Sequence, residues 1–509
     1  MKATKIFMMA ALALMTAACS SDDNDIAQQP AEQPANGEIT ITATIDSNDG
    51  ATTRALGIDG SNIASIWATT DEFAILFNDG SDNIKRTATV SSINGTTVTI
   101  TFTIPQALAN NTACTIVYPA SAANATNTGA DVAAALATQN GAIATTPEVR
   151  VGTATIDKDN HSLSSVTKLA AQNAIFKFTL KDIAGTADKA ATQFIVSNAS
   201  GDVLTTVTPG SATNELYVAL PALAAGTYWF NATVGGAPYI AKATVGTATT
   251  AGNYYQTQVN MATLGDLMAA NGKFYADAAA ITAASTTAIG VIAYLGTDNF
   301  TENGTTVGGN TFAGHGLVLC LKNAASGADA QWSTETSTLE FGDDAKVTNA
   351  DGLKRTTSVS GYTNTKTLAE KTDAATKYKA AYAAKNYTGL TAPAGTTGWF
   401  LPSAQQWVKM QEGLGGLAEG DITWVSWFNN DHSAATAWET ALAKAGAGNY
   451  DSMTSAYLWY WSSSEFSAKY AVLLGVDARG TGDDYGFRWY NYGKGYTYDN
   501  GRVRPVLAF

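Results

Sequence analysis

The first half of the chain alternates apolar and polar residues in short runs that turn residues separate. Residues 38–45 alternate with period two, and residues 97–104 place Val98, Ile100 and Phe102 on one face. This alternation predicts half-buried antiparallel strands. Further strand-like runs lie at residues 73–77, 114–119, 174–180, 193–196, 216–220, 227–230 and 254–259. We expect a mostly β half made of two β-sandwich domains, at residues 55–160 and 161–260.

The pattern changes after residue 260, where helical spacing joins the strands. Residues 289–295 and 316–321 are short apolar runs without alternation, which predicts strands buried on both faces. Helices are expected at residues 368–385 and 433–445, and a third is expected to begin at Ser403, which can form a capping box with Gln406. Strands are predicted again at residues 460–465, 470–474 and 501–506. Residues 261–509 therefore read as one α+β domain.

The N-terminus carries the marks of an exported lipoprotein. Lys2 and Lys5 precede an apolar run, and residues 16–19 (Thr-Ala-Ala-Cys) form a small-residue cleavage site ending in cysteine. The apolar run is too short to span a membrane. Residues 1–19 are thus predicted to be a signal peptide with a lipobox, and Cys19 to carry the lipid. The alternative is an ordinary secretory signal in which Cys19 is incidental.

Residues 20–54 are expected to hold a disordered tether and a removable first strand. Residues 20–37 are almost all small or polar and cannot bury enough surface to fold. The strand predicted at residues 38–45 follows, and then the sequence Thr-Thr-Arg-Ala places Arg54 before Ala55. Arg54 could also be one exposed arginine in a loop that is never cut.

Composition and charge narrow the partners. The 509 residues are 45% hydrophobic and 14% charged, with a formal net charge of -13. Such an acidic chain argues against nucleic acid and anionic lipid as partners. Besides Cys19 the cysteines are Cys114 and Cys320, which fall in different predicted domains. We expect both to be buried and unpaired.

Taken together, the lipobox, the acidic tether, the alternating strand, the Thr-Thr-Arg-Ala site and two β-sandwich domains resemble the fimbrillin family of type V pili. The resemblance implies that a trypsin-like protease cuts between Arg54 and Ala55. It also implies loss of the first strand, whose inward residues would be Ile39, Ile41, Ala43 and Ile45. A neighbouring pilus subunit would then supply a donor strand to the open sheet edge. The expected location is the outer membrane and the fimbrium, with membrane contact only through the precursor's lipid anchor.

Residues 261–509 resemble the bacterial C-type-lectin-like domains of surface adhesins. The motifs that carry this resemblance are Gly-Trp-Phe-Leu-Pro-Ser at 398–403, Tyr-Trp-Ser-Ser-Ser-Glu at 460–465 and Arg-Pro-Val at 504–506. In such modules these motifs are mostly framework. Neither calcium-binding triplet of the sugar-binding lectins, Glu-Pro-Asn or Gln-Pro-Asp, occurs in the chain, so no metal site is expected.

A ligand site is predicted in the aromatic stretch 483–498. Flat rings among polar side chains suit a sugar, which offers C–H surface for stacking and hydroxyls for hydrogen bonds. The alternative is that the tyrosines of this stretch, up to Tyr496 and Tyr498, only pack across a hairpin. The candidate ligand-binding residues are Asp483, Asp484, Arg488, Trp489, Tyr490 and Tyr492.

No catalytic pattern emerges, and no cofactor is expected. His161, His315 and His432 lie in unrelated contexts, without zinc-protease spacing or a nucleophile elbow, and we interpret each as a surface or hydrogen-bonded histidine. Two non-enzymatic functions remain. One is a pilus tip adhesin, because residues 503–509 read as the closing strand of the last module rather than as a spare donor strand. The other is a lipid-anchored glycan-binding protein outside any pilus, with a host or bacterial surface glycan or protein as partner.

Overall fold

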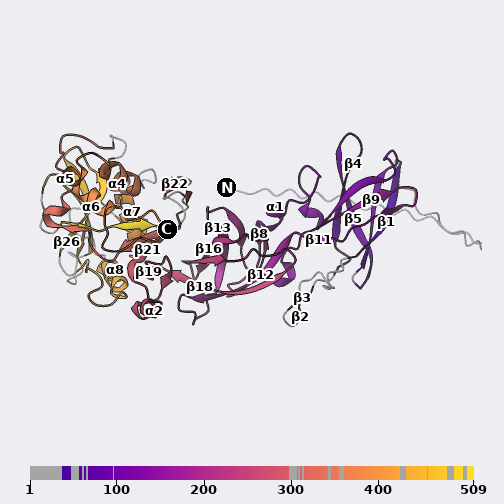
Figure 1. The fold of residues 1–509 in the computed structure, drawn as a ribbon, viewed down its shortest axis with the longest axis horizontal. Coiled ribbons are helices and arrows are strands. Elements are labelled where there is room, and N and C mark those ends of the chain that lie inside the picture. The colour runs from indigo at the N-terminus through magenta and orange to yellow at the C-terminus, as the bar shows by residue number, and fades with distance from the viewer. Residues whose placement is uncertain are drawn as a thin grey trace, which may run out of the picture.

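The computed structural model describes most of the chain beyond residue 36. The described ranges are 37–46, 57–59, 62–64, 67–95, 97–296, 306–307, 310–311, 314–341, 346–354, 360–422, 424, 432–454, 457–477, 486–496 and 501–509. The fold is mostly β, with helices only in short pieces until the C-terminal region. Figure 1 shows an elongated molecule in which two β bodies and a C-terminal α+β module follow one another along the long axis. Cys19, Arg54 and Ala55 lie outside the described residues.

The first body is an eight-stranded sheet with the order β1-β6-β5-β4-β7-β9-β10, in which β11 also pairs with β9. Its strands are β1 (Glu38–Asp46), β4 (Glu72–Asn78), β5 (Asn83–Asn94), β6 (Thr97–Pro105), β7 (Thr112–Tyr118), β9 (Arg150–Asp157), β10 (Ser162–Ser164) and β11 (Ala170–Ala171). A small hairpin, β2 (Gly57–Asp59) with β3 (Asn62–Ala64), stands apart. The sheet curls around one apolar core that includes Trp67, Phe73, Phe102 and Ile116, as in a β-sandwich or a barrel-like sheet.

The second body is another eight-stranded sheet, with the order β15-β12-β18-β17-β16-β13-β14-β8. Its strands are β8 (Thr138–Gln139), β12 (Asn173–Asp182), β13 (Ala191–Asn198), β14 (Val203–Val207), β15 (Glu215–Pro221), β16 (Gly226–Val234), β17 (Ala237–Val245) and β18 (Tyr254–Thr263). It has its own core, in which the rings of Phe178, Phe194 and Phe230 contact one another.

The two sheets are interleaved in sequence, which corrects the boundary expected at residue 160. β10 and β11 follow that point yet pair with β9 of the first sheet. Conversely, β8 precedes it and pairs with β14 of the second sheet. The connecting segment, with helix α1 (Val132–Leu136), packs with Leu76 of the first sheet and Ala219 of the second in one small core. Pairing between distant segments decides these positions, and local alternation does not reveal it.

The C-terminal module contains two five-stranded sheets. One has the order β20-β19-β21-β24-β30 and the other β25-β29-β26-β27-β28. The strands of the first are β19 (Leu267–Ala269), β20 (Phe274–Tyr275), β21 (Ala288–Leu295), β24 (Gly316–Cys320) and β30 (Val506–Ala508). The strands of the second are β25 (Ala325–Ser326), β26 (Leu458–Glu465), β27 (Tyr470–Asp477), β28 (Gly486–Gly493) and β29 (Gly501–Val503). A hairpin of β22 (Thr306–Val307) and β23 (Asn310–Thr311) lies outside both sheets.

Seven α-helices are described in this module, and they are α2 (Ala278–Ala283), α3 (Ala350–Lys354), α4 (Gly361–Ala369), α5 (Ala374–Lys377), α6 (Lys379–Lys385), α7 (Ala404–Gly413) and α8 (His432–Ala443). The capping box of Ser403 and Gln406 is confirmed at the start of α7. The single helix expected at residues 368–385 is wrong. It is broken into α4, α5 and α6, partly because Tyr378 has a non-helical backbone (φ -119°, ψ 54°). Among the described residues, no helix is long and apolar enough to cross a membrane.

The second body and the C-terminal module share an apolar junction. Trp229 and Ile240 of the second sheet pack in one cluster with Phe274, Val318 and Phe509 of the module. His315 lies here, only 2% exposed, with its ring 4.2 Å from that of Trp229. Neither ring nitrogen of His315 has a hydrogen-bond partner among the described residues. Our interpretation of His315 as a surface or hydrogen-bonded residue is therefore wrong, because tertiary packing encloses it.

Candidate functional site

β28 presents two different faces, because successive side chains of a strand point to opposite sides. Phe487 and Trp489 point into the core of the module, and Trp489 is only 2% exposed. Arg488, Tyr490 and Tyr492 point to the other side and line a hollow. The prediction that Trp489 contacts a ligand is therefore wrong. Asp483 and Asp484 lie outside the described residues.

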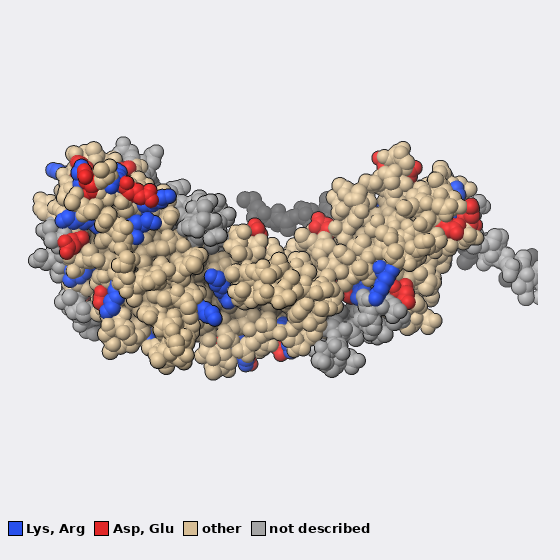
Figure 2. Space-filling model, viewed as in Figure 1, with Lys and Arg blue, Asp and Glu red and all other residues tan. Residues whose placement is uncertain are grey.

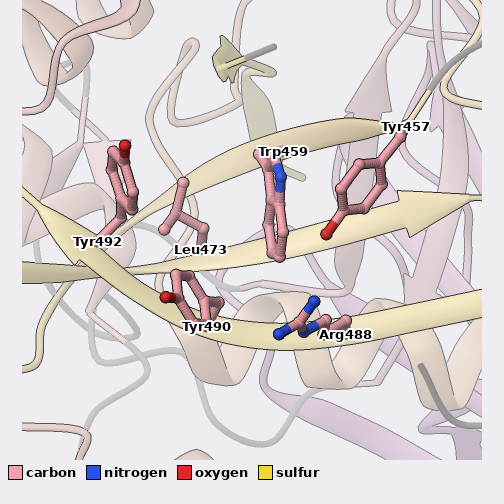
Figure 3. A pocket seen from close by; sticks show the side chains of 6 residues that line it. All are labelled: Tyr457, Trp459, Leu473, Arg488, Tyr490 and Tyr492. Atoms are coloured by element: carbon pink, nitrogen blue, oxygen red, sulfur yellow. The ribbon is translucent and has the colours of Figure 1, made fainter. Parts of the chain in front are cut away.

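The aromatic hollow, as we name it, has a volume of about 230 Å³ and is lined by Tyr457, Trp459, Leu473, Arg488, Tyr490 and Tyr492. These side chains rise from or beside three neighbouring strands, β26, β27 and β28, toward the same side (Figure 3). The ring centroids of Trp459 and Tyr490 are 5.6 Å apart, with the ring planes at 42°. Tyr457 lies 5.0 Å from Trp459 on its other side. The hollow therefore has walls of tilted rings.

Gly475 lets Trp459 lie across the sheet. It pairs with Trp459 on one side and with Arg488 on the other. A Cβ atom at Gly475 would come within 2.8 Å of the indole ring, which is closer than van der Waals contact allows. Glycine is thus a steric requirement of this site, as it is where another group approaches a strand closely.

Arg488 is the cation of the aromatic hollow. Its guanidinium carbon lies 5.2 Å from the ring centroid of Tyr490 and 5.8 Å from that of Trp459. These distances are within the range of cation–π attraction. No Asp or Glu is among the described residues that line the hollow.

A second hollow, of about 290 Å³, begins where β28 ends. Its described lining residues are Thr336, Lys469, Tyr470, Gly493, Gly495 and Tyr496. We call it the strand-end hollow. Tyr496 folds over Gly493, where a Cβ atom would come within 2.3 Å of its ring. The Tyr496 ring is also 5.7 Å from that of Tyr492, which links the two hollows.

A buried ion pair holds the end of β28. The side chains of Lys494 and Glu465 are 0% and 1% exposed and form a salt bridge. Glu465 also accepts hydrogen bonds from the backbone N–H groups of Glu340 and Phe341, at 2.9 and 3.2 Å. Lys494 further donates to the carbonyl of Thr338 at 3.1 Å. The pair therefore ties the strand-end hollow to the segment around residue 340.

The three C-terminal motifs of the sequence serve as framework. Trp399, Phe400 and Leu401 are buried. Arg504 is fully buried and donates to the side chain of Asn323 and to the carbonyl of Asp451. These contacts join β29 and β30 to neighbouring loops, and they leave the motif residues little surface for a ligand.

A separate candidate site is the position of β1 in the first sheet. β1 pairs antiparallel with β6 along all nine of its residues, from Glu38 opposite Pro105 to Asp46 opposite Thr97. Its inward residues Ile41, Ala43 and Ile45 are 0%, 5% and 0% exposed. On its other side, β1 is held at its middle, where the Thr42 N–H donates to the carbonyl of His161 at 3.0 Å.

Ile39, the fourth predicted inward residue, is only half-buried at the start of β1, and packs at the rim of the core. The structure thus brings Ile39, Ile41, Ala43 and Ile45 together on one face of one strand.

The structure brings Arg488, Tyr490 and Tyr492 together at the aromatic hollow. The sequence did not lead us to Tyr457 and Trp459. Both lie just before the Tyr-Trp-Ser-Ser-Ser-Glu motif at 460–465, and their aromatic side chains at alternate positions were a signal for one face of a strand.

The thiols of Cys114 and Cys320 and the imidazole of His315 are buried, where a substrate does not reach them. Cys114 and Cys320 are buried and unpaired, as predicted, and burial raises the pKa of each thiol to about 12. Burial, with a contribution from Lys242, lowers the pKa of His315 to about 4. Within the described ranges, no three His, Cys, Asp or Glu side chains are grouped so as to hold a metal ion.

Comparison with known proteins gives only distant similarities. No protein-family model matches the sequence, and no curated protein matches it. A fimbrial protein from Bacteroides ovatus ATCC 8483 is similar in structure, with 16% identity, 94% of this chain and 100% of that chain covered, and a TM-score of 0.32. A fimbrial assembly protein from Parabacteroides distasonis ATCC 8503 matches with 11% identity, over 43% of this chain and 90% of that chain, at a TM-score of 0.26.

A shaft pilin from Lactobacillus rhamnosus GG matches with 14% identity, over 45% of this chain and 98% of that chain, at a TM-score of 0.21. TM-scores this low do not establish a shared fold. The function of this chain is therefore argued from its own geometry.

Proposed function

We propose that this chain is a cell-surface adhesion subunit of fimbrial type. In this proposal it is exported as a lipoprotein through Cys19, cut between Arg54 and Ala55, and assembled by donor-strand exchange. The observation that carries the proposal is the place of β1. This strand completes the core of the first sheet, yet it precedes Arg54 in sequence and would leave with the N-terminal fragment.

Loss of β1 would make the first sheet unstable until another strand replaces it. Ile41, Ala43 and Ile45 are buried against the core, and their removal exposes apolar surface together with the unpaired edge of β6. An open edge of this kind is a template for strand addition. A strand from a neighbouring subunit would restore both the backbone hydrogen bonds and the apolar contacts, so the cut that releases the chain also prepares it for assembly.

The C-terminal module would be a lectin-like adhesive module that attaches to a surface glycan or protein. Its buried motifs provide the framework, and the aromatic hollow provides the contact surface. Figure 2 shows that charged side chains of both signs gather on this module, whereas much of the rest of the visible face is uncharged. A position at one end of a fibre suits such a module.

Tip position is supported by the pairing of β30. This strand is antiparallel to β24 inside its own module, and all three of its residues are buried. β30 is therefore committed to its own sheet and is not a donor strand. If the purified, cut protein polymerises with itself, the tip proposal is wrong.

Mass spectrometry of the mature N-terminus tests the whole proposal. We expect the surface form to begin at Ala55, and an Arg54→Ala variant to remain uncut and outside the fibre. A mature form that keeps a lipidated Cys19 would contradict the pilus proposal. It would favour the alternative, a lipid-anchored glycan-binding protein at the outer surface.

A further inference from the structure

Exposed aromatic rings gather at the two hollows of the C-terminal module. Six large apolar or aromatic side chains are exposed in the described part of the chain, and three of them, Tyr470, Tyr490 and Tyr496, line these hollows. Their exposed fractions are 40%, 40% and 66%. A cluster of exposed rings at one place on a protein marks a binding surface more often than chance exposure does.

The same surface offers hydroxyl and ammonium groups that form no hydrogen bond or ion pair with the described part of the chain. The structure gives no hydrogen bond to the hydroxyls of Tyr470, Tyr490 and Tyr496 from any described residue. The ammonium of Lys469 likewise makes no ion pair within the described ranges. Rings flanked by hydroxyl and ammonium groups match a ligand that has both C–H faces and hydroxyls.

Each hollow is too small to hold a whole ligand, but the two are close enough to bind different parts of one ligand. Volumes of about 230 and 290 Å³ fall below the roughly 300–1,000 Å³ of an ordinary small-molecule site. Each suits about one ring of a ligand. The contact between Tyr492 and Tyr496, at 5.7 Å between ring centroids, makes the surface continuous from one hollow to the next.

We infer that the two hollows form one extended site for a neutral oligosaccharide chain, with at least one sugar stacked in each hollow. The inference rests on the proposed adhesive role and specifies its ligand class. A neutral chain is favoured because, among the described lining residues, each hollow has a single cation, Arg488 or Lys469, and all its other side chains are uncharged. The net charge of -13 would repel a polyanion.

Length dependence of binding is the first test. The full-length protein is titrated by calorimetry with neutral hexasaccharides (chitohexaose, cellohexaose and mannohexaose) and with the corresponding monosaccharides. A ligand that spans two linked sites gains about 100-fold or more over a ligand that fills one. We expect at least one hexasaccharide to bind at least 100-fold more tightly than its monosaccharide. A hyaluronan hexasaccharide, which carries carboxylates, should bind more weakly than that neutral chain.

Variants in the two hollows are the second test. Tyr490→Ala removes a ring from the aromatic hollow, and Tyr496→Ala removes one from the strand-end hollow. Each should weaken hexasaccharide binding about threefold to tenfold, as expected for the loss of one ring contact. Tyr382→Ala is the matched control, because Tyr382 is 39% exposed on α6 of the same module and lines neither hollow.

Several results would overturn the inference. These are equal affinity for hexasaccharide and monosaccharide, tighter binding of hyaluronan, no binding of any neutral hexasaccharide, or loss of affinity in only one of the two tyrosine variants. Circular dichroism of each variant shows whether the fold is kept. Lys469→Gln changes an exposed side chain, so it probes the strand-end hollow without disturbing the core. None of these results affects the N-terminus of the mature protein, so failure here is distinguishable from failure of the proposed assembly.

Discussion

The backbone N–H of Thr42 in β1 donates a 3.0 Å hydrogen bond to the carbonyl of His161, which follows β9. β1 therefore connects β6 on one side with the β9–β10 end of the sheet on the other. His161 has a positive φ of 53° at the turn before β10, so its carbonyl is presented to β1 from a tight turn. Because of this contact, β1 closes the first sheet and is more than an added edge strand.

The position of Ala43 should restrict which strand can replace β1. After cutting and removal of the N-terminal fragment, a peptide with the sequence of residues 38–46 should bind back. The same peptide with Ala43→Phe should bind about tenfold or more weakly, because extra volume in a packed core costs about 1–3 kcal/mol. Fluorescence anisotropy of a labelled peptide measures both affinities.

Thr44→Phe in the same peptide is the matched control. Thr44 is exposed on the outward face of β1, so the larger side chain should be tolerated there. Equal loss of binding with both peptides would mean that the site left by β1 does not discriminate between inward and outward side chains of the replacing strand. Rebinding of neither peptide would argue against strand replacement.

The buried pair of Lys494 and Glu465 should be sensitive to the loss of one partner. Lys494→Met leaves the carboxylate of Glu465 buried without its cation, which costs about 3–5 kcal/mol. We expect hydrogen–deuterium exchange in β26 to β28 to accelerate accordingly. Combining Lys494→Met with Glu465→Gln should recover part of the protection, since no unpaired charge then remains.

Lys469→Met is the control for this experiment, because Lys469 is exposed a short distance away. If both single variants change exchange equally, the buried pair does not stabilise the end of β28. Unchanged exchange in Lys494→Met would contradict the prediction directly.

His315 should make the junction between the second body and the C-terminal module weaker in acid. Burial lowers the pKa of His315 to about 4, whereas an unfolded histidine titrates near 6.5. Below pH 6.5 His315 binds a proton in the unfolded chain, but it stays neutral in the folded junction until the pH falls to about 4. Stability is therefore full above that pH and is lost as the pH falls toward 4, by about 3 kcal/mol.

The test compares the native protein with His315→Phe, which keeps a ring against Trp229 without a titrating group. Hydrogen exchange of β16 and β30 at pH 7 and pH 4.5 should show a smaller pH effect in the variant, after correction for intrinsic exchange rates. An equal pH effect in both proteins would assign the acid sensitivity to other groups.

Cys114 and Cys320 should resist thiol reagents while the protein is folded. Their side chains are 4% and 0% exposed, and burial raises each pKa to about 12, so little thiolate forms at pH 8. Reaction with Ellman's reagent should be negligible in buffer and should reach two thiols per chain in denaturant for protein cut after Arg54. Rapid labelling in buffer would show that the first sheet, which holds Cys114 in β7, or the C-terminal sheet that holds Cys320 in β24 opens readily.

Local patterns in the chain were enough to predict many single elements. Alternation over residues 38–45 identified β1, and alternation over residues 97–104 identified β6, because period two in a strand maps directly onto a buried and an exposed face. The capping box of Ser403 and Gln406 located the start of α7, since both residues act within one turn. Such signals are short-range, and the structure confirms them.

Patterns that depend on distant partners were not readable in this way. β10 pairs with β9 rather than with the second sheet, and the helix expected through residue 378 is broken. Trp489 and Tyr490 are adjacent aromatic residues in the same stretch of sequence. Trp489 nevertheless lies in the core, and Tyr490 lines the aromatic hollow.

The amino-acid sequence by itself determined that this chain has an export signal pattern, strands in its first half and an aromatic-rich stretch near its end, because each of these is a property of consecutive residues. Only the tertiary structure decided that β1 closes a sheet against His161. It also decided that Trp459 joins Tyr490 and Tyr492 in one hollow. Both facts depend on which segments, far apart in the chain, are brought together by burial of apolar surface and by backbone pairing, and no local pattern encodes that choice.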